Sequence, residues 1–408
     1  MAASTTDAPT RGASALLIVG IAVLGFNLRP AAISVGPVLD EVTGTLGMSH
    51  TVAGVLTALP VVAFGAFGAA TPAAARRVGA HRLALLALVA VVAGLGLRPW
   101  TGNVAVFLLL SLVALAGMAT ANVLLPSLVK LHFPDRIGQV TALYTTSMAV
   151  GLTLSSVLTV PISDQFSPNG WRFGLVTWAA TAALAALPWL GLVRHDTRPA
   201  EAPHRWRLAE VARTRLGWAM ALLFGLQSMQ AYSVFGWFAQ LYRDAGFSAS
   251  TAGLLLGAIT GISIPLSLVI PAIAGRLGDP TRLFVALMAC YPAGYVGLLV
   301  APHGGAWLWA VLLGTGLSTF PLVLTLIGMR ARTPAGTAAL SGFTQSVGYT
   351  ISIAGPITIG ALYGATDGWQ VPLALLIAVC VPQLLMGLYA ARPRYVEDEL
   401  EARTSGDW

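Results

Sequence analysis

Charged residues are scarce in this chain, and their scarcity excludes an ordinary soluble protein. Only 10% of the 408 residues are Asp, Glu, Lys or Arg, whereas 56% are hydrophobic. Soluble globular domains carry about 25% charged residues. Because the chain has too little ionic surface to face water on all sides, we expect it to be an integral membrane protein.

Cysteine is also scarce, and the residue clusters that membrane enzymes need are missing. The two cysteines, Cys290 and Cys380, lie far apart in apolar runs without metal-ligand spacing, which predicts inert thiols. The apolar runs contain no constellation of His, Asp and Glu that would support catalysis. The sequence has no phosphate-cradling loop and no sizeable polar domain. We therefore expect neither an enzyme nor a sensor, and no cofactor or metal.

Long apolar runs fill most of the chain and predict about twelve transmembrane helices. A helix needs about 20 apolar residues to cross a bilayer. The runs are continuously apolar and lack the alternation of a membrane-spanning strand, so helices are favoured over a barrel. The expected fold is all-α. The predicted spans are residues 14–39, 50–73, 82–98, 104–130, 138–162, 171–193, 216–241, 249–275, 282–301, 306–329, 337–363 and 369–391.

The basic residues gather on one side of these spans. If the N-terminus is inside, nineteen of the 23 lysines and arginines face the cytoplasm, and Arg98, Arg172 and Arg243 face outward. The one remaining residue, Arg29, lies within the first span. This distribution predicts that both termini are cytoplasmic. It also accounts for the net charge of +7 without nucleic acid as a partner.

The two halves of the chain repeat one pattern at an offset of about 199 residues. The recurring positions are Ser49, Ala53 and Gly54 with Ser248, Ala252 and Gly253, then Pro72, Arg77 and Gly79 with Pro271, Arg276 and Gly278. A duplication of this kind predicts two parallel six-helix bundles, the architecture of major facilitator transporters. We expect bundles over residues 1–193 and 216–391, a cytoplasmic linker over 194–215 and a cytoplasmic tail over 392–408.

Two loops at corresponding places in the halves resemble the signature loop of major facilitator transporters. The first runs from Thr71 to Arg82, and it lacks the acidic residue that the pattern requires. Its counterpart runs from Gly275 to Arg282 and is closer to the pattern. The gating candidates in these loops are Arg77, Arg276 and Asp279. For the arginines, anchoring of the helix ends is the alternative role.

Arg29 is the one charged residue well inside a predicted span. It lies about 10 residues from the outer end of that span, roughly 15 Å at 1.5 Å per residue. Ionisable side chains at such depth are costly and mark functional sites. Pro30 removes a backbone donor and frees the carbonyl of Phe26. We expect Arg29 to face a solute site and to pair with an anionic or strongly polar substrate; bonding to helix carbonyls is the alternative.

Other polar and aromatic residues inside the spans are weaker candidates for substrate contacts. On the seventh span, Gln227, Gln230 and Trp237 share one helical face, with Tyr232 nearby. Hydrogen bonding between helices explains these residues equally well. Further candidates are Asn122 on the fourth span, Tyr144 on the fifth, and Gln345 and Tyr349 on the eleventh.

Two motifs resemble those of the cyanate and nitroimidazole porters of the major facilitator superfamily. The first is Asn27-Leu-Arg-Pro30 followed by Ser34-Val-Gly-Pro37. The second begins with Asn122-Val-Leu-Leu-Pro-Ser-Leu-Val-Lys130 and continues through Leu143-Tyr-Thr-Thr146. The resemblance implies secondary transport by alternating access in a prokaryotic inner membrane. It also implies that Asn27, Arg29 and Asn122 line the central cavity.

These observations predict a carrier for a small anionic or polar solute, cyanate-like or nitroimidazole-like, with Arg29 as its anchor. The expected partners are the solute and the lipid bilayer, and the expected state is a monomer. A multidrug efflux pump on the same fold is the alternative. Facilitated diffusion, exchange, and symport in which the substrate carries the proton all remain open.

Overall fold

The computed structural model describes residues 11–133, 136–166, 169–193 and 208–404, and within these ranges the chain is helical and has no strand. The predicted all-α fold is confirmed. The N-terminal half contains α1 (Arg11–Asn27), α2 (Pro30–Ile33), η1 (Gly36–Val38), α3 (Leu39–Leu46), α4 (His50–Ala63), η2 (Phe64–Gly68), α5 (Ala69–Val78), α6 (Ala80–Leu97), η3 (Arg98–Trp100), α7 (Val104–His132), α8 (Ile137–Asp164) and α9 (Gly170–Leu192).

The C-terminal half contains α10 (Leu208–Val211), α11 (Arg215–Asp244), α12 (Ala249–Gly261), α13 (Ser263–Arg276), α14 (Thr281–Val300), α15 (Ala306–Leu317), α16 (Thr319–Met329), α17 (Pro334–Ser352), α18 (Ala354–Thr366), α19 (Gln370–Ala391) and α20 (Val396–Thr404). Most of the predicted linker, residues 194–207, lies outside the described residues. The predicted tail contains the helix α20.

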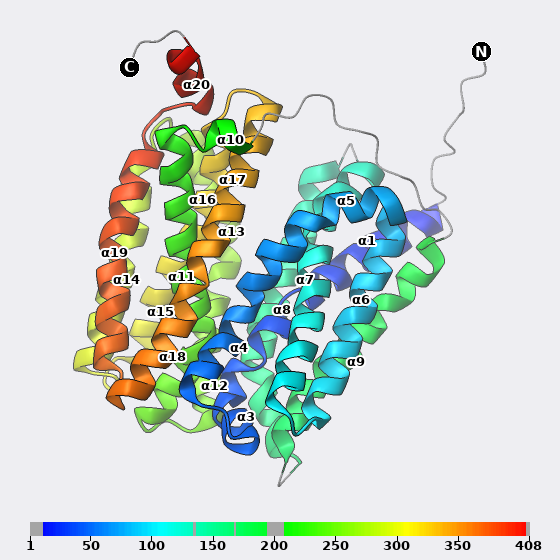
Figure 1. The fold of residues 1–408 in the computed structure, drawn as a ribbon, viewed down its shortest axis with the longest axis vertical. Coiled ribbons are helices and arrows are strands. Elements are labelled where there is room, and N and C mark those ends of the chain that lie inside the picture. Colours follow the sequence, from blue (N-terminus) through cyan, green and yellow to red (C-terminus); the bar gives the residue numbers. More distant parts are fainter. Residues whose placement is uncertain (1–10, 134–135, 167–168, 194–207, 405–408) are drawn as a thin grey trace.

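The observed helices follow the predicted spans, and one of them is less apolar than the others. Eleven segments of the described ranges are long and apolar enough to cross a membrane, and each coincides with a predicted span. The remaining span, 216–241, corresponds to α11, a helix of 30 residues. It runs with the other long helices of the C-terminal half (Figure 1), although residues such as Gln227 and Gln230 make it less apolar.

The long helices form two bundles that lie side by side (Figure 1). One bundle holds α1 to α9, and the other holds α11 to α19. The bundles meet at one end and diverge at the opposite end, where α5, α10 and α20 lie. We call these the closed end and the open end. The main contacts between the halves pair α4 with α18 and α8 with α12.

Two spans are interrupted beside a proline. Pro30 follows the break between α1 and α2, and Pro321 lies in the first turn of α16, after the break that ends α15. Proline cannot donate to the carbonyl four residues earlier, so it frees a carbonyl inside the membrane. For Pro321 that carbonyl belongs to Leu317, and it accepts a hydrogen bond from Nε2 of Gln227 at 3.0 Å. The broken backbone is thus satisfied by a side chain of a neighbouring helix.

Buried neutral groups link α11, α14 and α19 inside the C-terminal half. Gln383 donates to Oε1 of Gln227 at 2.6 Å, and Gln227 donates to the hydroxyl of Tyr291 at 2.9 Å. The Tyr295 hydroxyl donates to Oε1 of Gln230 at 2.6 Å. All three glutamine side chains are fully buried. This polar network, which we define as Gln227, Gln230, Gln383, Tyr291 and Tyr295, contains no ionised group.

The closed end is held by close backbone packing and by ion pairs between the halves. A Cβ added to Gly36 of η1 would lie 2.4 Å from the carbonyl oxygen of Phe235 in α11, so only glycine permits this approach. Arg243, at the end of α11, donates to Glu41 at 2.8 Å and to Asp40 at 3.5 Å, both in α3. The sequence placed Arg243 outside as a mark of topology, whereas the structure gives it carboxylate partners across the two halves.

The helix α20 docks on the open end of the C-terminal half through its acidic residues. Oε1 of Glu397 accepts hydrogen bonds from the backbone N–H groups of Arg332 and Thr333 at 3.0 Å each. Oε2 of Glu399 accepts from the N–H of Leu216 at 3.0 Å. These carboxylates bind donors at the start of α17 and α11, where helix N-termini favour negative charge. Although burial opposes ionisation, the backbone donors hold the pKa of Glu397 below its ordinary value.

Candidate functional site

A cavity of about 480 Å³ lies between the two halves. The N-terminal half contributes Arg29 and one face of α8, and the C-terminal half contributes α11, α12, α13, α15, α16 and α17. The lining residues are Arg29, Thr141, Thr145, Met148, Ala149, Leu152, Ser228, Ala231, Tyr232, Phe235, Ile259, Thr260, Ser263, Ser267, Pro271, Leu317, Phe320, Pro321, Leu324, Thr325 and Tyr349.

Arg29 reaches this cavity because the first span breaks beside it. Arg29 occupies the N-cap position of α2, and Pro30 is the first residue of that helix. The Phe26 carbonyl freed by Pro30 packs against α8, where a Cβ on Gly151 would lie 2.1 Å from its oxygen. The close approach of α1 to α8 therefore requires glycine at position 151. It also fixes the backbone from which the Arg29 side chain projects.

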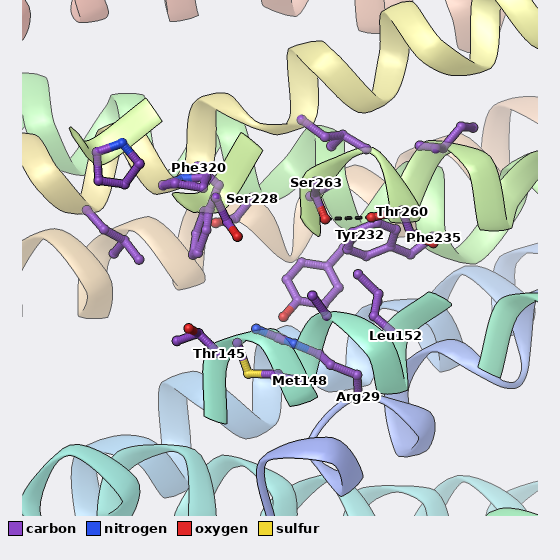
Figure 2. Close-up of a pocket in the computed structure, with 18 of the residues that line it drawn as sticks. Arg29, Thr145, Met148, Leu152, Ser228, Tyr232, Phe235, Thr260, Ser263 and Phe320 are labelled. Atoms are coloured by element: carbon purple, nitrogen blue, oxygen red, sulfur yellow. Dashed lines mark hydrogen bonds between the residues drawn. The ribbon is translucent and has the colours of Figure 1, made fainter. Parts of the chain in front are cut away.

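The guanidinium of Arg29 faces tyrosine hydroxyls and not carboxylates. Figure 2 shows the Tyr232 hydroxyl directed toward the guanidinium, and the two side chains interact. Tyr349 also lies within electrostatic range of Arg29. No carboxylate of the described residues forms an ion pair with Arg29. A half-buried cation without an internal counter-charge is suited to an anionic ligand.

The remaining wall of the cavity is apolar with scattered hydroxyls. Met148 and Leu152 of α8 face Phe235 of α11 and Phe320 of α16 across the space (Figure 2). The hydroxyl of Ser263 is occupied, because it donates to the carbonyl of Thr260 at 2.5 Å. Arg29 is the one charged side chain among the described residues that line the cavity. The site thus offers one positive charge in largely apolar surroundings.

The structure brings three of the predicted substrate residues together and places the others elsewhere. Arg29, Tyr232 and Tyr349 line the cavity. Gln227 and Gln230 lie in the buried polar network of the C-terminal half. They project from the side of α11 opposite Tyr232. Their contacts are hydrogen bonds between helices, which is the alternative role that the sequence analysis gave them.

Asn27 and Trp237 also hydrogen bond within their own halves. Asn27 donates to the carbonyl of Val23 at 2.9 Å and accepts from the hydroxyl of Thr181 in α9 at 2.8 Å. Trp237 is buried and donates to the carbonyl of Pro356 in α18 at 3.1 Å. Neither side chain lines the cavity.

The last three substrate candidates are not among the residues that line the cavity. Tyr144 is buried against α1, Asn122 is half-buried in α7, and Gln345 donates to the Ser341 hydroxyl within α17 at 2.8 Å. Their role in substrate binding stays a prediction, because none of the three lines the cavity in this conformation.

The gating candidates lie at the open end and are exposed. Arg77 and Arg276 are exposed at the ends of α5 and α13. Asp279 accepts hydrogen bonds from the backbone N–H and the hydroxyl of Thr281 at 2.9 and 2.5 Å, which lower the pKa of its carboxyl. Asp279 therefore stabilises the turn before α14, whose N-cap residue is Pro280. The described ion pairs do not join it to Arg276.

Arg98 is a buried charge that the sequence did not single out. The spans predicted it at an outer helix end, whereas the structure buries it fully, with its guanidinium donating to Ser34 at 3.3 Å and to Ser111 at 3.4 Å. Its Nε has no hydrogen-bond partner. Ser34 caps the end of α2, so Arg98 braces the short helix that begins beside Arg29.

Sequence reasoning also missed that one helical face of α8, and one of α11 beyond Tyr232, line the cavity. Thr141, Thr145, Met148 and Leu152 recur at helical spacing along α8. Ser228, Ala231, Tyr232 and Phe235 do so along α11. The signal was present as a helical face in each case. The described residues contain no group of His, Cys, Asp and Glu that would hold a metal ion.

Comparison with known proteins agrees with this fold and identifies the family. Residues 15–356 match the sequence profile of the Major Facilitator Superfamily. The chain is 36% identical to an uncharacterized transporter, YycB, of Bacillus subtilis (strain 168), over 95% of this chain and 96% of that protein.

Two further relatives carry named substrates. The chain is 31% identical to the 2-nitroimidazole transporter of Escherichia coli (strain K12), over 93% of this chain and 96% of the relative. It is 28% identical to the cyanate transport protein CynX of the same organism, over 91% and 95% of the two chains. The resemblance drawn from the two motifs is therefore confirmed.

A solved structure shares the fold at low sequence identity. A bacterial homolog of the human lysosomal transporter Spinster, in an inward-facing and occupied conformation, superimposes with a TM-score of 0.76 at 15% identity. The match covers 95% of this chain and 98% of that one. At this identity the likeness extends to the fold alone.

Proposed function

Because the chain belongs to the Major Facilitator Superfamily and is a multi-pass membrane transporter, we propose that it carries a small anionic or strongly polar solute anchored by Arg29. The observation that supports this most strongly is the half-buried guanidinium in the cavity between the halves, without a carboxylate partner. The relatives named for 2-nitroimidazole and cyanate transport support the broad class of small polar or anionic solutes.

The mechanism we propose is alternating access by rocking of the two halves around Arg29. At the closed end, Arg243 binds Asp40 and Glu41 across the halves. The reverse state requires these ion pairs to break while contacts form at the open end. Exposed ion pairs contribute about 0–1 kcal/mol. The ion pairs of Arg243 are therefore weak enough to break in each transport cycle.

In this proposal the protein works as a monomer in a bacterial inner membrane, with the open end facing the cytoplasm. The excess of lysine and arginine on the side that carries both chain ends supports this orientation. Arg77, Arg276 and Asp279 then lie at the cytoplasmic surface, where gating contacts would form in the reverse state.

The test is uptake into proteoliposomes by wild type and by Arg29→Ala. Radiolabelled cyanate and 2-nitroimidazole are supplied with and without a pH gradient, which also separates proton coupling from facilitated diffusion. We expect Arg29→Ala to abolish saturable uptake while the protein still inserts into the membrane. The matched control is Arg213→Ala, an exposed arginine outside the spans. Wild-type rates in Arg29→Ala would remove the anchor role.

Multidrug efflux on the same fold is the second candidate, and the apolar wall formed by Met148, Phe235 and Phe320 favours it. Pumps for cationic drugs commonly rely on embedded carboxylates, and no described lining residue is acidic. Deletion of the gene should therefore leave sensitivity to cationic drugs unchanged. A marked increase in sensitivity would favour efflux over the anion carrier.

A further inference from the structure

Resting on the function proposed above, we propose that the preferred solute of this cavity is an aromatic monocarboxylate. The class follows from three properties of the cavity: the number of charges on its wall, its volume, and the chemistry of its remaining surface.

The charge on the cavity wall favours a solute that carries one negative charge. Arg29 is the one charged residue among the described lining residues. A neutral solute would leave the guanidinium without a counter-charge, and a cation would be repelled. A dianion would place its second charge in largely apolar surroundings without a partner, which is costly. One carboxylate, bound by the planar fork of the guanidinium with the Tyr232 hydroxyl beside it, satisfies the site.

The volume of the cavity selects a solute larger than a triatomic ion. The cavity measures about 480 Å³, which lies within the range of roughly 300–1,000 Å³ for pockets that enclose organic molecules. A cyanate ion bound at Arg29 would leave most of the wall in contact with water. A larger solute with an apolar body displaces that water and gains hydrophobic binding free energy.

The surface beyond Arg29 selects an aromatic body. Phe235 and Phe320 line the cavity together with Tyr232 and Tyr349, so rings are present on three helices, α11, α16 and α17. Met148 adds a thioether, which makes favourable contacts with aromatic rings. A flat ring can stack on these faces or meet their edges. An aliphatic chain of equal size would lose more rotational freedom on binding.

The first experiment measures binding of five probes to the purified wild-type protein by calorimetry. The probes are benzoate, its neutral counterpart benzamide, the dianion phthalate, and the small anions acetate and cyanate. We expect benzoate to bind at least about tenfold more tightly than each of the others, since each lacks the ring or the single charge.

Two substitutions locate the effect. Arg29→Gln should bring benzoate and benzamide to similar affinity, whereas Phe320→Ala should weaken benzoate severalfold and leave acetate unchanged. The exposed Arg213→Gln serves as the control. If a variant fails to fold, the comparison of the five probes on wild type still decides the question.

The outcomes separate this inference from the function on which it rests. If cyanate or acetate binds as tightly as benzoate and depends on Arg29, the aromatic class is wrong and the anion carrier stands. If benzamide matches benzoate and Arg29→Gln changes neither, both proposals fail. Binding of none of the five probes would also overturn the aromatic class.

Discussion

The two halves of this transporter treat polar groups inside the membrane in opposite ways. In the N-terminal half the first span is broken, and the break delivers Arg29 to the cavity without a counter-charge. In the C-terminal half the corresponding helix α11 is unbroken, and its glutamines are satisfied by the buried polar network. At the repeat offset of about 199 residues, the position of Arg29 corresponds to the neutral Ser228.

In the proposed function, this difference gives a scaffold of two bundles one binding site. A neutral network that satisfies every member makes a half rigid. A cation left without a counter-charge can be neutralised by an anionic solute. We therefore assign the chemistry to the N-terminal half and to the cavity face of α11, and the structural role to the network behind that face.

The largest effect is expected from Gly151→Ala in α8. Its added Cβ would lie 2.1 Å from the Phe26 carbonyl oxygen, so α1 must move away from α8 and the break beside Arg29 is displaced. Overpacking of this kind costs about 1–3 kcal/mol or more. Thermal unfolding of the purified protein measures it. Gly328→Ala is the control, because nothing lies within 4 Å of its added Cβ; equal melting temperatures for both variants would refute the close packing.

A loss of stability of similar size is expected from Gln227→Leu in the buried polar network. The substitution leaves the Leu317 carbonyl, the Tyr291 hydroxyl and one amide of Gln383 without partners. Buried unsatisfied groups cost about 1–3 kcal/mol. We expect a lower melting temperature with the affinity ratio between an anion and its neutral counterpart unchanged. A change in that ratio would give the network a role in substrate choice and weaken the contrast between the halves.

Acid should act on the N-terminal half through His132, at the end of α7. Its Nε2 lies 2.8 Å from Nε2 of His81, and burial followed by the nearby His81 lowers its pKa from 6.5 to about 4. The unfolded chain then binds the proton more tightly, so stability falls as the pH drops from 6.5 toward about 4.

Because His132 is only half-buried, the loss should be on the order of 1 kcal/mol after solvent screening. Melting temperatures across this pH range measure it for wild type, His132→Gln and the exposed His303→Gln in the C-terminal half. We expect His132→Gln alone to flatten the profile. Identical profiles for all three proteins would exclude His132 as the source.

The smallest effect is expected from the ion pairs at the closed end. Arg243→Gln removes the links to Asp40 and Glu41, which contribute about 0–1 kcal/mol. The equilibrium between the two access states should shift by no more than about fivefold toward opening at this end. Distances between spin labels on the two halves report the populations. A complete switch of state would mean that the ion pairs of Arg243 hold the closed end. The packing of α4 with α18 and of α8 with α12 would then contribute little.

The sequence predicted most of the fold because span length, apolarity and charge distribution are physical consequences of the bilayer. It placed Arg29 well because a charge at that depth is conspicuous. It could not assign faces on α11, where Gln227 and Tyr232 are both plausible cavity residues and only the packing of α14 and α19 decides between them. It also missed the burial of Arg98, since a charge at the end of a span looks the same whether it faces water or Ser34.

The central claim of the proposed function is that Arg29 binds the solute because no carboxylate among the described residues forms an ion pair with it. The direct test is to supply one. Met148 lines the same cavity on α8, and Met148→Glu and Met148→Gln have similar size and differ in charge. Calorimetric binding of a small organic anion should be lost in Met148→Glu, where Arg29 gains an internal partner, and kept in Met148→Gln. Anion binding in Met148→Glu at wild-type affinity would contradict the account.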